Sequence, residues 1–105
     1  MVPKKKRVSK ELFQAIVKKG DTLSVPLFIF RYIPSVDAHY AVVAPKGVAK
    51  KAVARNKLRR QGYAAINSYP LKPCAAIFFY KKEAKNASYS EIKENVAKIL
   101  SKIKL

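Results

Sequence analysis

Residues 46–60 form a stretch that is dense in positive charge and carries no negative charge. Seven of these fifteen residues are Lys or Arg, and no Asp or Glu occurs anywhere between Asp37 and Glu83. Because like charges repel one another, such a stretch folds compactly only where solvent or a partner screens it. Lys and Arg that contact phosphates release condensed counterions, so the stretch predicts a surface that binds nucleic acid.

The charge of the whole chain supports this prediction. Lys and Arg number 23 against 6 Asp and Glu, which gives a formal charge of +17 over 105 residues. Half of the residues are hydrophobic, as in an ordinary globular protein. We therefore expect a flexible basic arm at residues 1–7 and a single RNA-binding domain at residues 8–105. A membrane surface or an acidic protein is a weaker candidate partner.

The cysteine content and hydropathy indicate a cytoplasmic protein. A single cysteine cannot form an intramolecular disulfide, which favours a reducing compartment. No apolar run reaches the length of a membrane-spanning helix, and the N-terminus lacks the apolar segment of a signal peptide. We expect neither a membrane partner nor a requirement for a protein partner.

The first half of the chain predicts a helix followed by two strands. Ser9 suits an N-cap, Leu12, Phe13, Ile16 and Val17 share one helical face, and Gly20 suits the end of the helix. Residues 23–33 are rich in strand formers. A turn over residues 34–38 leads to a second strand at 39–44, expected to pair antiparallel with the first.

The second half predicts a helix, a strand and a final helix. The helix begins at Gly47 and runs at least to Gln61, and Gly62 either ends or weakens it. The apolar run 74–80 indicates a buried strand, which the helical crossover allows to lie parallel to strand 39–44. Ser88 and Glu91 form a capping box for the last helix. The order α-β-β-α-β-α predicts an α+β two-layer sandwich with a small mixed sheet.

The residues that commonly perform catalysis are sparse. His39 has no evident catalytic or metal-binding partner, and Cys74 opens a buried strand, where it is expected to be a small core residue. The six acidic residues show no metal-binding spacing, and the three glycines are isolated. We expect no catalytic residue, metal site or cofactor in this chain, which indicates a binding protein.

The segment 52–60 resembles the protein component of bacterial ribonuclease P. That family carries an Arg-Asn-Arg signature on a basic helix, which Arg55, Asn56 and Lys57 match with Lys in place of the second Arg. Lys46 matches a basic turn before the helix, and Arg59 and Arg60 match basic residues after the signature. Residues 5–20 resemble the family's first helix, and residues 74–100 resemble its last strand and helix.

This resemblance implies a fold, a function and a set of site residues. The family fold is an α+β sandwich with a left-handed β-α-β crossover, like one domain of a small-subunit ribosomal protein. The RNA subunit holds the active site and its Mg²⁺ ions, while the protein binds that catalytic RNA and the 5′ leader of precursor tRNA. The residues implied in RNA binding are Lys46, Lys50, Lys51, Arg55, Asn56, Lys57, Arg59 and Arg60. Those implied at the leader cleft are Phe13, Val17, Arg31 and Arg59.

Three departures from the family pattern stand out. Val17 occupies a position where the family often has an aromatic residue, and Arg31 occupies another such position. Lys57 replaces an arginine and lacks the planar fork that binds a phosphate in a bidentate manner.

Three other hypotheses fit parts of the sequence. Size and charge alone fit a structural RNA-binding protein of the ribosomal type. The run from Pro3 to Arg7 also resembles a nuclear localisation signal, which would fit a nuclear or DNA-associated protein. An independent nuclease is the least supported of the three, because catalytic residues are sparse.

Overall fold

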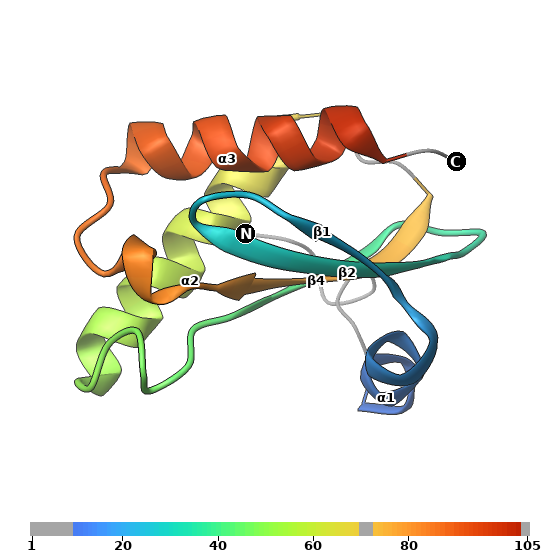
Figure 1. The fold of residues 1–105 in the computed structure, drawn as a ribbon, viewed down its shortest axis with the longest axis horizontal. Coiled ribbons are helices and arrows are strands. Elements are labelled where there is room, and N and C mark those ends of the chain that lie inside the picture. The colour runs from blue at the N-terminus through green and yellow to red at the C-terminus, as the bar shows by residue number, and fades with distance from the viewer. Residues whose placement is uncertain (1–9, 70–72, 104–105) are drawn as a thin grey trace.

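The computed structural model describes residues 10–69 and 73–103, so the expected basic arm at 1–7 lies outside the described residues. Figure 1 shows three helices around one sheet. In chain order the elements are α1 (Lys10–Lys19), β1 (Asp21–Ser24), β2 (Phe28–Pro34), β3 (His39–Val43), α2 (Ala52–Asn67), β4 (Cys74–Tyr80), the short 3-10 helix η2 (Lys82–Ala84) and α3 (Tyr89–Lys102). The α+β class with a small mixed sheet is confirmed.

The four strands lie in the order β1-β2-β4-β3. β4 is antiparallel to β2 and parallel to β3, so the predicted parallel pairing is confirmed. The predicted antiparallel pairing of residues 23–33 with the next strand is wrong, because β4 lies between β2 and β3. Six of the seven residues of β4 are buried, and only a central position covers such a strand on all sides.

The extended stretch 23–33 forms two strands rather than one. Pro26, expected near the start of a strand, lies in the turn between β1 and β2, where its missing N–H costs no sheet hydrogen bond. Val25 donates a 3.0 Å hydrogen bond from its backbone N–H to the Phe28 carbonyl across this turn. The resulting hairpin places β1 at the edge of the sheet.

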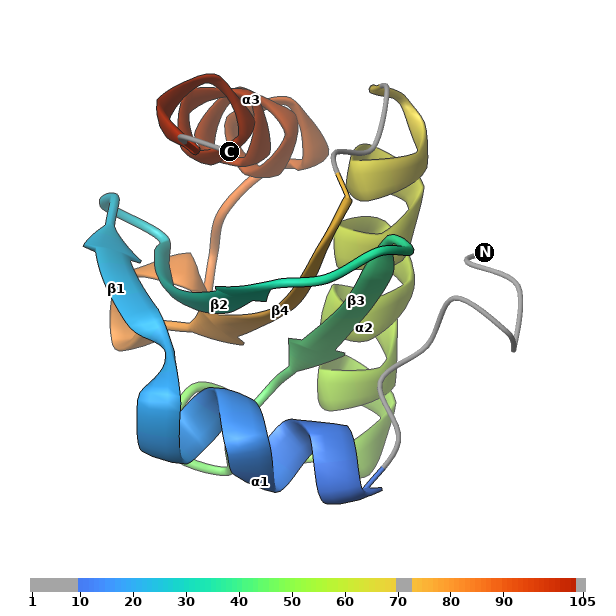
Figure 2. The ribbon, with the colours of Figure 1, turned by 90° about the vertical axis from the view of Figure 1, so that its right-hand side faces the viewer.

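Helices cover both faces of the sheet, so α1 adds a layer to the expected two. Side chains alternate along β4, so that Ile77 packs under α1 with Ile16, whereas Phe78 joins the larger core on the other face. That larger core also receives Leu58 from α2 and Ile92 from α3. In Figure 2, α1 lies below the sheet and α3 above it, and the first half of α2 extends past the sheet edge to the level of α1.

Side-chain hydrogen bonds hold the two C-terminal helices in place. Ser88 and Glu91 form the predicted capping box of α3. The buried Asn95 accepts a 3.1 Å hydrogen bond from the backbone N–H of Leu27, which ties α3 to the β1–β2 turn. α2 continues through Gly62, which lies against Val42 and Tyr80 where a side chain would not fit. None of the described helices is long and apolar enough to cross a membrane.

Candidate nucleic-acid interface

The basic stretch begins in a turn rather than in a helix. Residues 45–51, which we call the Pro45 turn, are closed by a 3.0 Å hydrogen bond from the Val48 N–H to the Pro45 carbonyl. Val48 and Ala49 are buried in the core, and residues 46–51 form turns and bends rather than a helix. The helix therefore begins at Ala52, and its predicted start at Gly47 is wrong.

The Pro45 turn is held by the first arginine of the signature. Arg55 Nη1 donates to the backbone carbonyls of Lys50 at 2.7 Å and Ala49 at 3.1 Å, and its side chain is half-buried. Sequence analysis assigned Arg55 to RNA alone, whereas the structure also gives it this role within the fold. A guanidinium carries five N–H donors, and both of these bonds use Nη1.

The other predicted RNA-binding side chains are exposed to solvent. Arg59 donates a hydrogen bond to the side-chain carbonyl of Asn56, one turn earlier on α2. Lys57 and Arg59 are two residues apart and so point to opposite sides of a helix with 3.6 residues per turn. The exposed members of the set are Lys46, Lys50, Lys51, Asn56, Lys57, Arg59 and Arg60. The structure thus spreads the cations around the start of α2 rather than along one stripe.

Helix α1 presents a small apolar hollow beside its own basic residues. This α1 hollow, lined by Phe13, Gln14, Val17 and Lys18, has a volume of about 270 Å³. Phe13 is half-buried with its ring edge-on to Phe79, at 6.2 Å between centroids, whereas Val17 is 44% exposed. One part of the Phe13 ring therefore packs against the sheet, and the rest faces solvent.

Arg31 lies at the C-terminal end of α1, where its guanidinium forms hydrogen bonds within the protein. Its Nη2 donates to the carbonyls of Val17 at 2.7 Å and Gly20 at 3.1 Å. Phe13, Val17 and Arg31 therefore come together around α1, as three of the four predicted cleft residues. The fourth, Arg59, lies on the separate helix α2.

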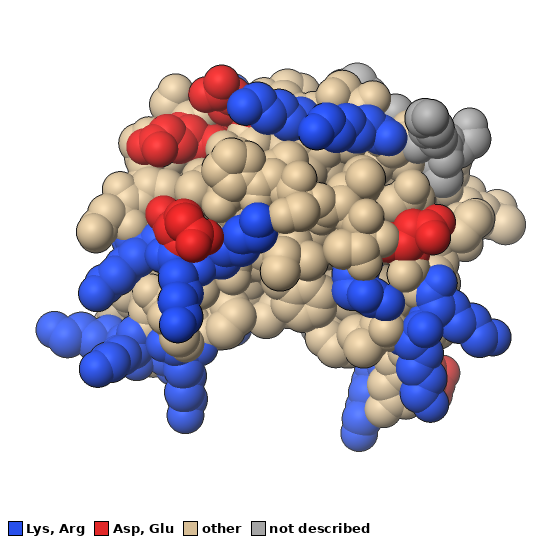
Figure 3. Space-filling view, in the orientation of Figure 1, with Lys and Arg blue, Asp and Glu red and all other residues tan. Residues whose placement is uncertain are grey.

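Basic side chains border a wider uncharged surface between the two helices. Figure 3 shows one basic group over α1 and another over the Pro45 turn and the start of α2, with a hollowed surface between them. Ile29 on β2 is 40% exposed and lies on the same face of the strand as Arg31, the face toward α1. Sequence analysis did not assign Ile29 or Phe79 to this surface, although strand alternation places both on one face.

The residues considered for catalysis do not assemble a reactive site. Among residues 10–69 and 73–103 no group of three or more His, Cys, Asp or Glu side chains is placed to hold a metal ion. Cys74 is buried within 3.2 Å of the Tyr40 hydroxyl, as expected for a core residue. His39 is half-buried at the start of β3. The exposed cations on α1, the Pro45 turn and α2 can bind an anionic polymer.

A family model described as Ribonuclease P matches residues 2–104. This chain belongs to the ribonuclease P family. The family model spans all elements of the fold, including the Pro45 turn, α2 and α1. The recognition made from the Arg55-Asn56-Lys57 motif is therefore confirmed.

Solved structures of family members share the fold over nearly the whole chain. The RNase P protein from Thermotoga maritima aligns with a TM-score of 0.82 at 19% identity, covering 94% of this chain and 98% of that chain. An RNase P protein of Staphylococcus aureus gives 0.77 at 21% identity, covering 91% and 93%. A second S. aureus structure gives 0.73 at 25% identity, covering 99% of both chains. No curated protein matches this sequence.

Proposed function

We propose that this chain is the non-catalytic protein subunit of a bacterial ribonuclease P, which removes the 5′ leader from precursor tRNA. Family membership implies association with ribonuclease P RNA. The observation that supports a role with two RNA ligands is the pair of basic surfaces, over α1 and over the start of α2, on either side of a hollowed uncharged surface. The bacterial cytoplasm is the compartment where this activity would operate.

The surface around α2 suits the folded catalytic RNA. Its exposed Lys and Arg side chains lie on a rigid helix and a turn that Arg55 holds closed. Because the backbone that carries these cations is already ordered, binding to phosphates needs no further folding of the chain, and the released counterions favour binding. Mg²⁺ would belong to the RNA partner, and the protein residues would supply neutralising charge.

The surface beside α1 suits a single-stranded leader. Proteins bind such strands with a positive groove and aromatic platforms, and one base on a platform contributes about 1–3 kcal/mol. Phe13 and Val17 offer partly exposed apolar surface here, and Lys18 lies at its border. Val17 is smaller than an aromatic ring, so we expect weaker stacking at that position.

The decisive experiment is cleavage of precursor tRNA by a cognate ribonuclease P RNA at low Mg²⁺ concentration, with and without this protein. We expect faster cleavage and tighter binding of precursor tRNA than of mature tRNA when the protein is present. Equal cleavage with RNA alone would overturn the proposal. Tight binding to RNA with no preference for the precursor would favour the ribosomal-type alternative.

The protein by itself provides the control for catalysis. The proposal expects that a preparation free of RNA leaves precursor tRNA intact, because the bond-breaking groups belong to the RNA subunit. Sustained cleavage by such a preparation would support the independent-nuclease hypothesis.

A further inference from the structure

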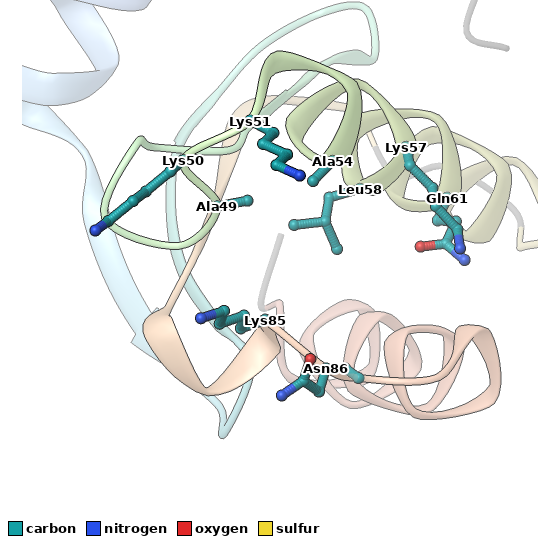
Figure 4. Close-up of a pocket in the computed structure, with 10 residues that line it drawn as sticks. Ala49, Lys50, Lys51, Ala54, Lys57, Leu58, Gln61, Lys85 and Asn86 are labelled. Carbon is teal, nitrogen blue, oxygen red and sulfur yellow. The ribbon is translucent and has the colours of Figure 1, made fainter.

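A separate cavity lies beside the basic helix α2. This cavity, which we call the α2 pocket, has a volume of about 450 Å³ and lies between the first half of α2 and residues 85–87, which lead into α3 (Figure 4). That volume is within the range of roughly 300–1,000 Å³ typical of small-molecule sites. The α2 pocket shares no lining residue with the α1 hollow, so it is a separate site.

The floor of the α2 pocket is apolar. In Figure 4, Leu58 points into the space between α2 and the 85–87 segment, with Ala49 and Ala54 beside it. Leu58 is only 6% exposed, so it forms a fixed surface rather than a mobile one. A phosphate ion gains nothing from such a floor, whereas the flat face of a nucleobase does.

The border of the α2 pocket is cationic, and none of its lining residues is acidic. The Lys51 side chain extends into the space from one end, Lys57 lies along α2, and Lys85 lies on the opposite wall (Figure 4). Lys51 is also the N-cap of α2 and makes no side-chain cap, and the first turn of α2 contains no acidic residue. The positive end of the helix dipole therefore adds to the lysine charges.

Two carboxamides complete the lining. Gln61 comes from α2, and Asn86 comes from the segment before α3. Each carboxamide offers both hydrogen-bond donors and an acceptor, the groups that pair with the polar edge of a base. The cavity thus combines an apolar floor, amide groups and surrounding cations, which match the base face, base edge and phosphate of one nucleotide.

We propose that the α2 pocket binds a single unstacked nucleotide of the RNA partner, with the base against Leu58 and the phosphate near Lys51, Lys57 and Lys85. This inference rests on the proposed function, because it deepens how the same chain recognises its RNA. Arg55 contributes as a positioning residue, since its bonds to the Ala49 and Lys50 carbonyls hold one wall of the pocket. The 85–87 segment thereby gains a role that the basic motif does not indicate.

The test uses the full chain without any tRNA. Amide NMR spectra are recorded while each of the four ribonucleoside 5′-monophosphates, ribose 5-phosphate or inorganic phosphate is added. We expect at least one mononucleotide to shift the Gln61 and Asn86 side-chain signals and to bind on the order of tenfold more tightly than inorganic phosphate. Equal affinity for phosphate and all mononucleotides, or shifts confined to other surfaces, would overturn the proposal.

Two variants make the test specific. Ala54→Phe fills the pocket from an exposed helix position, and Ala64→Phe makes the same change at an exposed position of α2 outside the pocket. Ala54→Phe is expected to abolish mononucleotide binding, and Ala64→Phe to preserve it. Lys85→Gln is expected to weaken binding severalfold, with Lys98→Gln on α3 as its charge-matched control. Equal effects within either pair would contradict the site.

The outcome is separable from that of the cleavage experiment. If mononucleotides do not bind but the protein stimulates cleavage, only the proposed nucleotide site in the α2 pocket is overturned. If mononucleotides bind but the protein has no effect on cleavage of precursor tRNA, only the proposed role in ribonuclease P is overturned.

Discussion

The Nη2 atom of Arg31, on β2, lies 2.7 Å from the Val17 carbonyl oxygen in the last turn of α1. The same atom also donates to the Gly20 carbonyl, and Nη1 donates to the Thr22 hydroxyl. Carbonyls at the end of a helix lack intrahelical partners, and a cation there also compensates the negative end of the helix dipole. Arg31 thus ties the C-terminal end of α1 to β2.

Replacing Arg31 by Met therefore tests a structural role that sequence analysis did not assign. We expect Arg31→Met to lower the free energy of unfolding by about 1–2 kcal/mol, because several charge-assisted hydrogen bonds are lost at a partly exposed site. Urea denaturation measures the change, and Arg31→Lys is expected to recover part of it. A fully stable Arg31→Met protein would show that α1 is held by packing alone.

Gly62 is required by close packing inside the larger core. A Cβ atom at Gly62 would lie 2.9 Å from Val42 Cγ1 and 3.0 Å from the Tyr80 hydroxyl oxygen. We expect Gly62→Ala to destabilise the protein by about 1–3 kcal/mol, although alanine is the better helix former. Gly47→Ala is the matched control, because a Cβ there meets no atom within 4 Å. Thermal unfolding compares the two variants, and equal midpoints would contradict the packing argument.

The Tyr80 hydroxyl links β4 to α2 by donating a 2.6 Å hydrogen bond to the Leu58 carbonyl. Burial raises the pKa of this hydroxyl above its ordinary value of about 10. Above that value the unfolded chain releases the proton while the folded chain retains it, so Tyr80 lowers stability as pH rises. We expect Tyr80→Phe to lower the free energy of unfolding by about 1 kcal/mol near neutral pH. We also expect the stability of this variant to fall less steeply at alkaline pH. Urea titrations at neutral and alkaline pH measure both effects, and an unchanged alkaline slope would exclude Tyr80 as its source.

Arg59 is exposed on α2, so its removal should affect RNA binding more than folding. We expect Arg59→Ala to weaken binding to ribonuclease P RNA and to reduce the slope of log affinity against log salt by about 0.7–0.9, the value of one phosphate contact. Lys98→Ala on α3 removes the same charge from an exposed site, and we expect it to leave the slope unchanged. Binding titrations at several salt concentrations measure both slopes. Equal slopes for the two variants would place Arg59 off the RNA.

Val17 allows the α1 hollow to be tested with little risk to folding, because the side chain is 44% exposed. We expect Val17→Ala to reduce the preference for precursor over mature tRNA by roughly three- to tenfold in the complex with ribonuclease P RNA. Val36→Ala makes the same change at a side chain that is 94% exposed, between β2 and β3. Competition binding measures the preference for precursor over mature tRNA. An unchanged preference for Val17→Ala would show that the leader does not bind in this hollow.

Local patterns in the sequence determined much of this protein. The apolar stripe with Ile16 marked α1, and Ser88 with Glu91 marked the start of α3 through contacts only three residues apart. The near-continuous apolar run of β4 indicated a strand buried on both faces. Charge density and the Arg55-Asn56 motif indicated an RNA-binding family. This inference was possible without the fold, because charged side chains are generally exposed to solvent.

The tertiary structure decided which distant groups meet. β4 lies between β2 and β3 and forms hydrogen bonds with both of them. The local sequence of either neighbouring strand does not show that β4 will pair with it. The bonds of Arg31 to Val17 and of Arg55 to Lys50 bring guanidiniums to carbonyls in turns and helix ends. The α2 pocket joins Leu58 to Asn86, which lie in separate segments of the chain. Such contacts follow from packing over long sequence separations, so composition and periodicity do not determine them.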